Sequence, residues 1–78
     1  MIQELENVVL SVALPEYGLK QGDIGTVVLV HRGGEGYEVE FMTLDGETVA
    51  VVSLFASQVR LLVGHREIAN ARPIEERV

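Results

Sequence analysis

Glu38 and Glu40 are the first residues whose type and spacing could do chemistry. On a strand, side chains two positions apart share a face and lie roughly 7 Å apart, which is in range for two carboxylates to bind one metal ion or share a proton. The simpler interpretation, which we favour, is a charged outer face that keeps the sheet soluble. His31 and His65 are the only histidines and cysteine is absent, so a zinc site would need carboxylate ligands as well. We therefore predict no metal and no cofactor.

Other groups with catalytic potential also lack a suitable arrangement. His31 and Arg32 adjoin a glycine-rich turn whose backbone N–H groups could bind an anion, but a solvated strand end is the simpler interpretation. The turn has neither the spacing nor the following helix of a phosphate-binding loop. Ser11, Ser53 and Ser57 have no histidine and acid at a spacing typical of a nucleophilic triad. We therefore predict that the chain is not an enzyme and has no catalytic residues.

Residues 22–41 form the element that must position these side chains. Residues 24–30 are rich in β-branched side chains, which favour a strand, and the glycines of residues 33–36 suit a tight hairpin turn. Three large apolar residues alternate with the two glutamates and are predicted to face the core: Tyr37, Val39 and Phe41. Gly25 lies inside the first strand, where a glycine indicates a bend, a bulge or a close backbone approach. In a small barrel we expect a bend.

Three further apolar runs complete a predicted set of five strands: residues 8–14, 48–54 and 59–63. Asp45 and Gly46 predict a tight turn before the second run, and residues 55–58 suit a short 3-10 turn before the third. This order predicts an all-β fold, an SH3-like five-stranded small barrel over residues 1–64. Residues 65–78 are expected to form a C-terminal tail that packs on the barrel or on a neighbouring chain.

The composition is that of one small acidic domain. The chain has 78 residues, 47% of them hydrophobic, and twelve acidic against six basic residues give a net charge of −6. This charge opposes binding to a phosphate backbone. The N-terminus lacks the basic segment of a signal peptide, and no apolar run is long enough to span a bilayer. We therefore expect a cytoplasmic protein without a membrane partner, and nucleic acid is disfavoured as a partner.

The strands contain more apolar residues than one barrel interior can hold. Residues 8–14, 26–30 and 48–54 are apolar at both alternating positions, although a small barrel has only one inside. The surplus needs a cover, which is either the tail or a partner. The expected partner is a protein, either a second copy in a homo-oligomer or a larger, basic protein. The residues expected to bind it are Val9, Val28, Val30, Glu35, Glu38, Glu40, Val49, Val51, Ile68 and Ile74.

Four motifs in a fixed order carry a resemblance to a known family. The segments LPEYGL, GDIGTVV, YEVEF with its following DG turn, and ASQVR resemble a bacterial family, domain of unknown function 4926. The resemblance covers roughly residues 8–62. It implies a stand-alone SH3-like barrel of unknown activity, and it brings no established site residues.

A second resemblance suggests an alternative function. GDIGTVVLV is similar to one half of the motif of KOW domains, which are SH3-like and occur in ribosomal and transcription-elongation proteins. Those domains usually surround the motif with lysine and arginine, whereas acidic residues surround it here. We therefore expect a non-catalytic protein–protein interaction module, such as an accessory or antitoxin-like subunit. A KOW-like nucleic-acid or ribosome-associated domain is the alternative.

Overall fold

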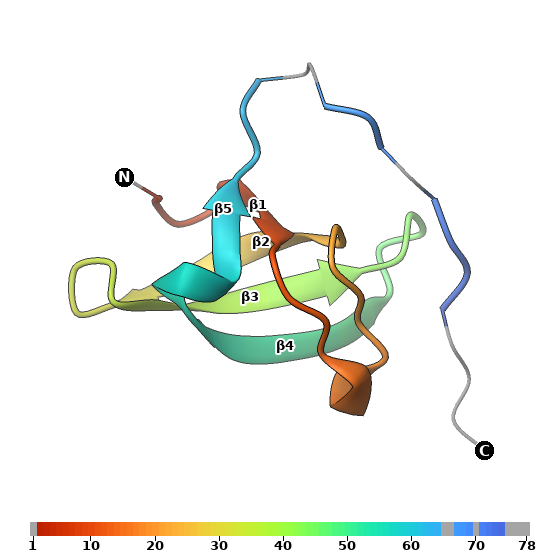
Figure 1. Ribbon diagram of the computed structural model, residues 1–78, viewed down its shortest axis with the longest axis horizontal. Helices are drawn as coiled ribbons and strands as arrows, with labels where there is room; N and C mark the ends of the chain where they lie inside the picture. Colours follow the sequence, from red (N-terminus) through yellow and green to blue (C-terminus); the bar gives the residue numbers. More distant parts are fainter. Residues whose placement is uncertain (1, 65–66, 70, 75–78) are drawn as a thin grey trace.

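The computed structural model describes residues 2–64, 67–69 and 71–74. Its five strands form one antiparallel sheet in the order β4-β3-β2-β1-β5, which curls into a small barrel (Figure 1). The strands and 3-10 turns, in chain order, are β1 (Asn7–Leu10), η1 (Pro15–Tyr17), β2 (Ile24–His31), β3 (Gly36–Met42), β4 (Thr48–Phe55), η2 (Ala56–Gln58) and β5 (Val59–Leu61). This architecture confirms the predicted all-β, SH3-like fold with a 3-10 turn before the last strand.

The first strand is shorter than predicted. It ends at Leu10, and a long loop follows. The loop folds back on itself, and the backbone N–H of Leu14 donates to the carbonyl of Leu19 at 2.9 Å.

Among the described residues, no helix is long and apolar enough to cross a membrane.

Strand β2 connects the two halves of the barrel, and Gly25 is what lets it do so. Residues 24–26 of β2 pair with β1, and residues 26–31 pair with β3. A Cβ atom at position 25 would lie 2.5 Å from Cγ1 of Val39 and 3.1 Å from the carbonyl oxygen of Glu40. Of the three interpretations of this glycine, the structure shows a close approach and not only the bend that we expect from the sequence, since no side chain fits between β2 and the inner face of β3.

The core lies on the inner face of the sheet, and β3 shows how the sequence builds it. The alternation in β3 turns its three large apolar residues inward and its two glutamates outward, as predicted. Strand β4 contributes Ala50, Val52 and Leu54 in the same way. The buried apolar residues that form the core cluster are Val8, Leu10, Leu19, Val27, Tyr37, Val39, Phe41, Val52, Leu54 and Val59.

Two irregularities in the sheet decide which valines face outward. The β2–β3 register shifts between Val27 and Leu29, so Val28 and Leu29 both point outward and Val30 turns back. Val30 packs against the core, so its predicted place on the outer face is wrong. A second shift, between the pairs Phe41–Ala50 and Met42–Thr48, leaves Val49 without a partner on β3.

Val9 is buried as well, which corrects its predicted role as an accessible partner-binding residue. Its side chain is 6% exposed although its neighbours along β1 belong to the core. The reason is that Val9 pairs with Ile24 and Arg60 and lies in a small groove that Leu62 also lines. Long-range packing therefore covers the outer side of β1.

The described parts of the tail run down one side of the barrel (Figure 1). Both carboxylate oxygens of Glu67 accept hydrogen bonds from the guanidinium of Arg60, at 2.7 and 2.9 Å. Further along, Arg72 forms an ion pair with Asp23. Ile68 is 97% exposed and Ile74 is 50% exposed. The described tail thus contacts its own barrel through charged groups more than through apolar ones.

Candidate functional site

The outer face of β2, β3 and β4 carries an acidic ridge, formed by Glu38 and Glu40 at the centre of the three strands. In the sheet register, Glu38 lies between Leu29 on β2 and Ser53 on β4, and Glu40 lies opposite Val51. Because β3 lies between β2 and β4, both carboxylates project from the centre of this three-stranded face rather than from its rim.

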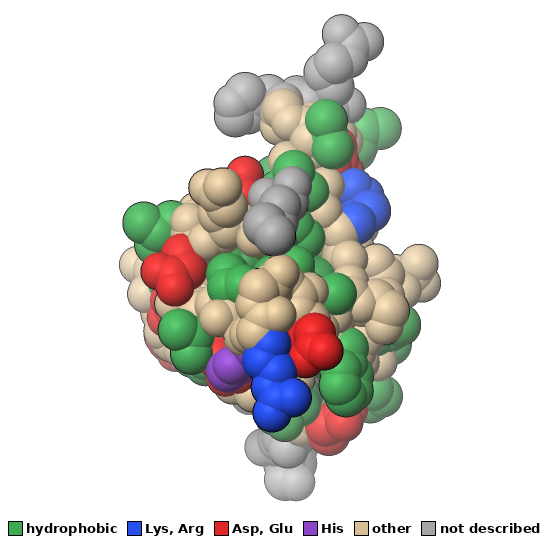
Figure 2. Space-filling view, turned by 90° about the vertical axis from the view of Figure 1, so that its left-hand side faces the viewer, with side chains coloured by type: hydrophobic (Ala, Val, Ile, Leu, Met, Phe, Trp, Pro, Cys, Tyr) green, Lys and Arg blue, Asp and Glu red, His purple; other side chains and the backbone are tan. Residues whose placement is uncertain are grey.

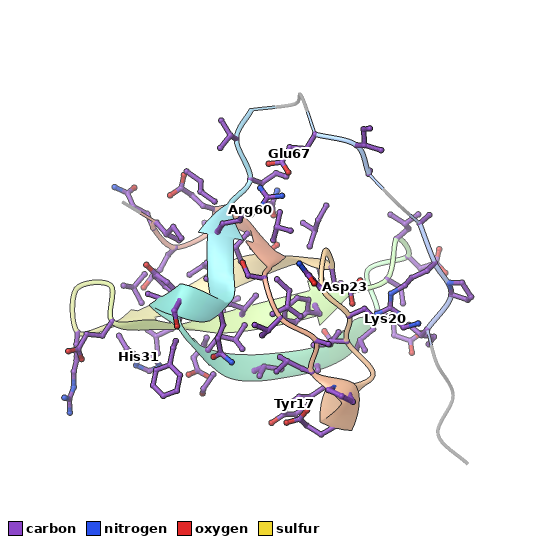
Figure 3. The ribbon with its side chains drawn as sticks, in the orientation of Figure 1. Tyr17, Lys20, Asp23, His31, Arg60 and Glu67 are labelled. Carbon is purple, nitrogen blue, oxygen red and sulfur yellow. The ribbon has the colours of Figure 1, made fainter. Side chains whose placement is uncertain are left out.

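Glu38 is held in place by side chains from both neighbouring strands. Its Oε2 accepts a hydrogen bond from Oγ of Ser53 at 2.5 Å. The same oxygen lies 2.6 Å from Nε2 of His31, which Figure 3 labels near the β2–β3 turn. These hydrogen bonds, that from Ser53 foremost and then that from His31, lower the pKa of Glu38 below its ordinary value. Glu40 has one such contact, a hydrogen bond of 2.6 Å from Oγ1 of Thr48. Both carboxylates of the ridge are therefore held in direction by hydrogen bonds.

The structure thus brings a serine, a histidine and an acid together, although their spacing in sequence gave no sign of it. Their order is wrong for nucleophilic catalysis. In a triad the histidine lies between the serine and the acid and takes the serine proton. Here Ser53 and His31 both contact the same oxygen of Glu38, so the acid, and not the histidine, lies between the other two groups. The two contacts orient the carboxylate of Glu38.

The ridge also has no partner groups for metal binding. No group of three or more histidine, aspartate or glutamate side chains is placed to hold a metal ion in the part of the chain that the structure describes. His65, which we considered as a second imidazole ligand, lies outside the described residues.

Two backbone amides of the glycine turn beside His31 are hydrogen-bonded within the turn itself. The backbone N–H groups of Gly34 and Glu35 both donate to the carbonyl of His31, at 3.0 and 3.1 Å. Arg32 is 3.9 Å from the carboxylate of Glu35, and both side chains are largely exposed. The segment is a hairpin turn with a weak surface ion pair.

Exposed apolar side chains lie on both sides of the acidic ridge. They are Val28 and Leu29 on β2 and Val51 and Phe55 on β4, and their exposed fractions range from 40% to 73%. We call these four residues, together with the acidic ridge, the outer docking face. Figure 2 views the end of the molecule with the β2–β3 turn and shows hydrophobic side chains lying among acidic ones.

The residues predicted to bind a partner are distributed over several places in the structure. The outer docking face contains Val28, Val51 and both ridge glutamates, and Glu35 lies in the adjacent turn. Three other predicted residues are exposed outside this face. Val49 and Ile74 line a groove beside the β3–β4 turn, and Ile68 borders the small groove that Val9 lines.

Sequence reasoning missed two residues of this face, Leu29 and Phe55. Strict alternation would turn Leu29 inward, and only the bulge at Val28 brings it out. Phe55 pairs with Gly36 at the end of β4, and its ring is 73% exposed. A signal for Phe55 was present, since an aromatic residue directly after the inward-facing Leu54 must point outward in a strand.

Comparison with known proteins gives one match. A family model described as Domain of unknown function (DUF4926) matches residues 4–61, which confirms the resemblance expected from the four motifs. No curated protein matches the chain, and no solved structure matches it.

Proposed function

The chain belongs to the DUF4926 family, and on that premise we propose that it is a non-catalytic protein–protein interaction module that uses its outer docking face. The observation that carries the proposal is the pattern on this face. Four exposed apolar side chains flank two fixed carboxylates. Interfaces that bind specifically combine an apolar surface with a few oriented polar groups in this way.

The apolar flanks supply the affinity in this proposal. Phe55 and Val51 lie on the same strand, two pleat repeats apart, and both are more than half exposed. Aromatic residues are enriched among the side chains that dominate binding energy, and truncating one such residue costs about 2 kcal/mol or more. Phe55 is therefore the residue whose removal is expected to weaken binding most.

The acidic ridge favours one of the two expected kinds of partner. A second copy that docked through the same face would bring two ridges together, because a two-fold interface places the same patch on both sides. Glu38 and Glu40 would then face the same two carboxylates, in a chain of net charge −6. Such a contact is repulsive, whereas lysine or arginine side chains would form charge-assisted hydrogen bonds with the ridge. We therefore propose a basic protein partner, as for an accessory or antitoxin-like subunit.

The carboxylates of the outer docking face also oppose the nucleic-acid alternative. Phosphate backbones are bound by lysine and arginine with release of counterions. The outer docking face carries carboxylates at its centre, and the basic residue of the adjoining turn, Arg32, is close to Glu35. No described feature of this face favours a KOW-like function.

The test compares a variant of the face with a matched variant elsewhere. Phe55→Asp adds a charge within the outer docking face, and Val63→Asp adds one at a similarly exposed valine beyond β5. Wild type and both variants are immobilised, and proteins captured from the host are quantified by mass spectrometry. We expect a basic protein that is retained by wild type and by Val63→Asp, and lost by Phe55→Asp.

The captured partner is then purified and its affinity measured at two salt concentrations. Binding should weaken at least about 30-fold for Phe55→Asp, which corresponds to about 2 kcal/mol, and it should weaken as salt rises. Equal binding by both variants would contradict the proposal. So would light scattering that shows a homodimer broken by Phe55→Asp, because the face would then bind a second copy.

A further inference from the structure

A groove lies at the end of β3 that is farther from the outer docking face's β2–β3 turn. The long loop after β1, the β3–β4 turn and the tail surround it. Its volume is about 630 Å³. The tail residues Arg72, Pro73 and Ile74 line one side. The barrel side is mainly apolar and is formed by Leu19, Ile24, Phe41, Met42, Leu44 and Val49.

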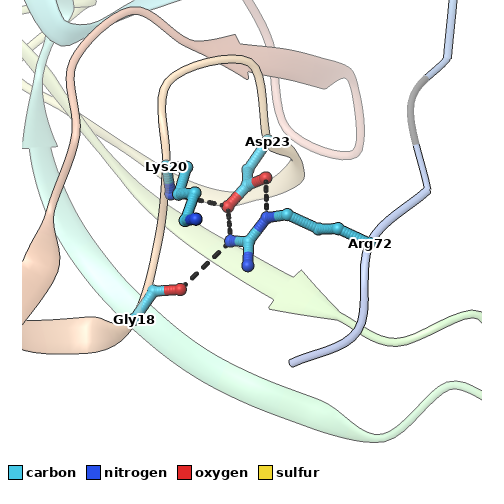
Figure 4. A network of polar contacts seen from close by, with 4 residues as sticks. All are labelled: Gly18, Lys20, Asp23 and Arg72. Atoms are coloured by element: carbon cyan, nitrogen blue, oxygen red, sulfur yellow. Dashed lines mark hydrogen bonds and ion pairs between the residues drawn. The ribbon is translucent and has the colours of Figure 1, made fainter. Parts of the chain in front are cut away.

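One charged contact anchors the tail at this groove (Figure 4). The guanidinium of Arg72 forms a two-pronged contact with Asp23, in which Nε donates to Oδ1 at 3.0 Å and Nη2 donates to Oδ2. Nη2 also donates to the backbone carbonyl of Gly18 at 3.0 Å. Arginine bound in this planar, two-pronged way is recognised by geometry as well as by charge.

The acceptor side of this contact is built by the barrel and does not depend on the tail. The backbone N–H of Lys20 donates to Oδ2 of Asp23 at 2.8 Å, and the N–H of Leu10 in β1 donates to the carbonyl of Asp23 at 2.8 Å. Burial by itself would raise the pKa of Asp23, but the hydrogen bonds from Arg72 and Lys20 outweigh it and lower that pKa. The barrel thus presents a fixed carboxylate beside a backbone carbonyl.

The tail fills the groove poorly beyond its arginine. Ile74 is half exposed, and on the barrel side Met42 is 47% exposed and Leu44 is 99% exposed. Apolar surface of the groove therefore stays in contact with water while the arginine site is occupied. A peptide with the same arginine and better apolar contacts would bury more of this surface and bind more tightly than the tail does.

We propose that this groove is a peptide-binding site for an extended, basic segment of a partner protein, with arginine followed by proline and an aliphatic residue. In this proposal the chain's own residues 71–74 are the resident, displaceable ligand. Proline restricts the preceding residue to extended conformations, so an Arg-Pro pair presents its guanidinium at low entropic cost. The negative charge of Asp23 and the net charge of −6 complement a basic segment.

The tail then competes with a partner peptide for the groove. A ligand tethered by a short linker acts at an effective concentration in the millimolar range, so an added peptide must compete with it. Removing the guanidinium of Arg72 releases the site without changing the barrel that forms it. In wild type, only the fraction of molecules in which the tail has left the site can bind an added peptide, and the apparent affinity is reduced by that fraction. The variant should remove this reduction, so its apparent affinity for the peptide should be higher.

The experiment uses the full-length chain and a capped peptide with the sequence of residues 69–74, followed by amide NMR spectra. Wild type is compared with Arg72→Ala, and with the double variant Arg72→Ala/Asp23→Asn. We expect Arg72→Ala to bind the peptide at least about tenfold more tightly than wild type, with shifts at Leu19, Met42 and Leu44. The double variant, and the peptide with alanine in place of arginine, should show no such shifts.

Several results would overturn the proposal. Equal peptide affinity in wild type and Arg72→Ala would show that the tail does not compete. Undiminished binding by the double variant, with spectra that show a folded barrel, would show that Asp23 is not the receptor. A wild-type homodimer that Arg72→Ala converts to a monomer would mean that the groove takes the tail of a second copy instead.

Discussion

Gly25 offers a direct test of how closely β2 and β3 pack. A Cβ atom added at this position would lie 2.5 Å from Cγ1 of Val39, whereas ordinary contacts are 3.4–4 Å, and the carbonyl oxygen of Glu40 at 3.1 Å limits movement away from it. Inserting one methyl group into a packed core costs about 1–3 kcal/mol. We predict that Gly25→Ala lowers the free energy of unfolding by this amount, which is about 4–8 °C in melting temperature per kcal/mol for a domain of this size.

The magnitude can be assigned to one contact by a double-mutant cycle with Val39. This residue is fully buried, and Val39→Ala removes two methyl groups at a cost of about 2–3 kcal/mol from lost burial and the cavity left behind. In the double variant, the Cβ atom added at position 25 enters the space left by Cγ1 of Val39. The double variant should therefore be more stable than the sum of the two single changes predicts, by at least about 1 kcal/mol.

Urea denaturation followed by circular dichroism measures all four proteins of the cycle. Leu54→Ala provides the control, because Leu54 is also buried but pairs with Tyr37 toward the other end of β3. Its effect should add to that of Gly25→Ala within about 0.5 kcal/mol. If the cycle with Val39 were additive to the same extent, the contact of 2.5 Å would not govern the packing of β2 on β3, and the reasoning would be refuted.

Three further predictions concern charge and burial. The pKa of Asp23 is lowered in the folded state, so the ionised carboxylate stabilises the fold above its unfolded pKa, and this stabilisation is lost as pH falls through the folded pKa. We therefore expect the urea concentration at the unfolding midpoint to fall as the pH is lowered below about 4. In Asp23→Asn this fall should be less steep. Ser53→Ala removes the strongest hydrogen bond to Glu38, so the pKa of that carboxyl should rise in an NMR titration. Leu10→Ala should cost about 2–5 kcal/mol, whereas Phe55→Ser, at an exposed position, should change stability by less than about 0.5 kcal/mol.

Local patterns in the sequence were sufficient to predict the strands and the inner face of β3. The alternation of Tyr37, Val39 and Phe41 with two glutamates is a property of neighbouring residues, and the structure keeps it. The tight turn at Gly46 and the 3-10 turn before the last strand follow from local chemistry in the same way. Most of the fold was predictable because its turns and strand faces are encoded within a few residues.

The parts that could not be predicted depend on pairing between distant residues. The bulge at Val28 exists because β2 must match the register of β3, and no residue near it gives a local signal. The contact between Ser53 and Glu38 spans the β3–β4 register, and that between Arg72 and Asp23 joins positions 49 residues apart. A single sequence gives strand positions but not these cross-strand and tail contacts, which determine both candidate sites.

Strand β4 lies at one edge of the sheet and pairs with β3 alone among the described strands. Its eight residues, TVAVVSLF, contain no charge and no proline, which are two of the devices that keep an open edge from recruiting another chain. Such a segment is typical of those that stack into amyloid-like fibrils. Mutual repulsion between chains of net charge −6 opposes this, so solutions should become prone to fibril formation as acid neutralises the carboxylates.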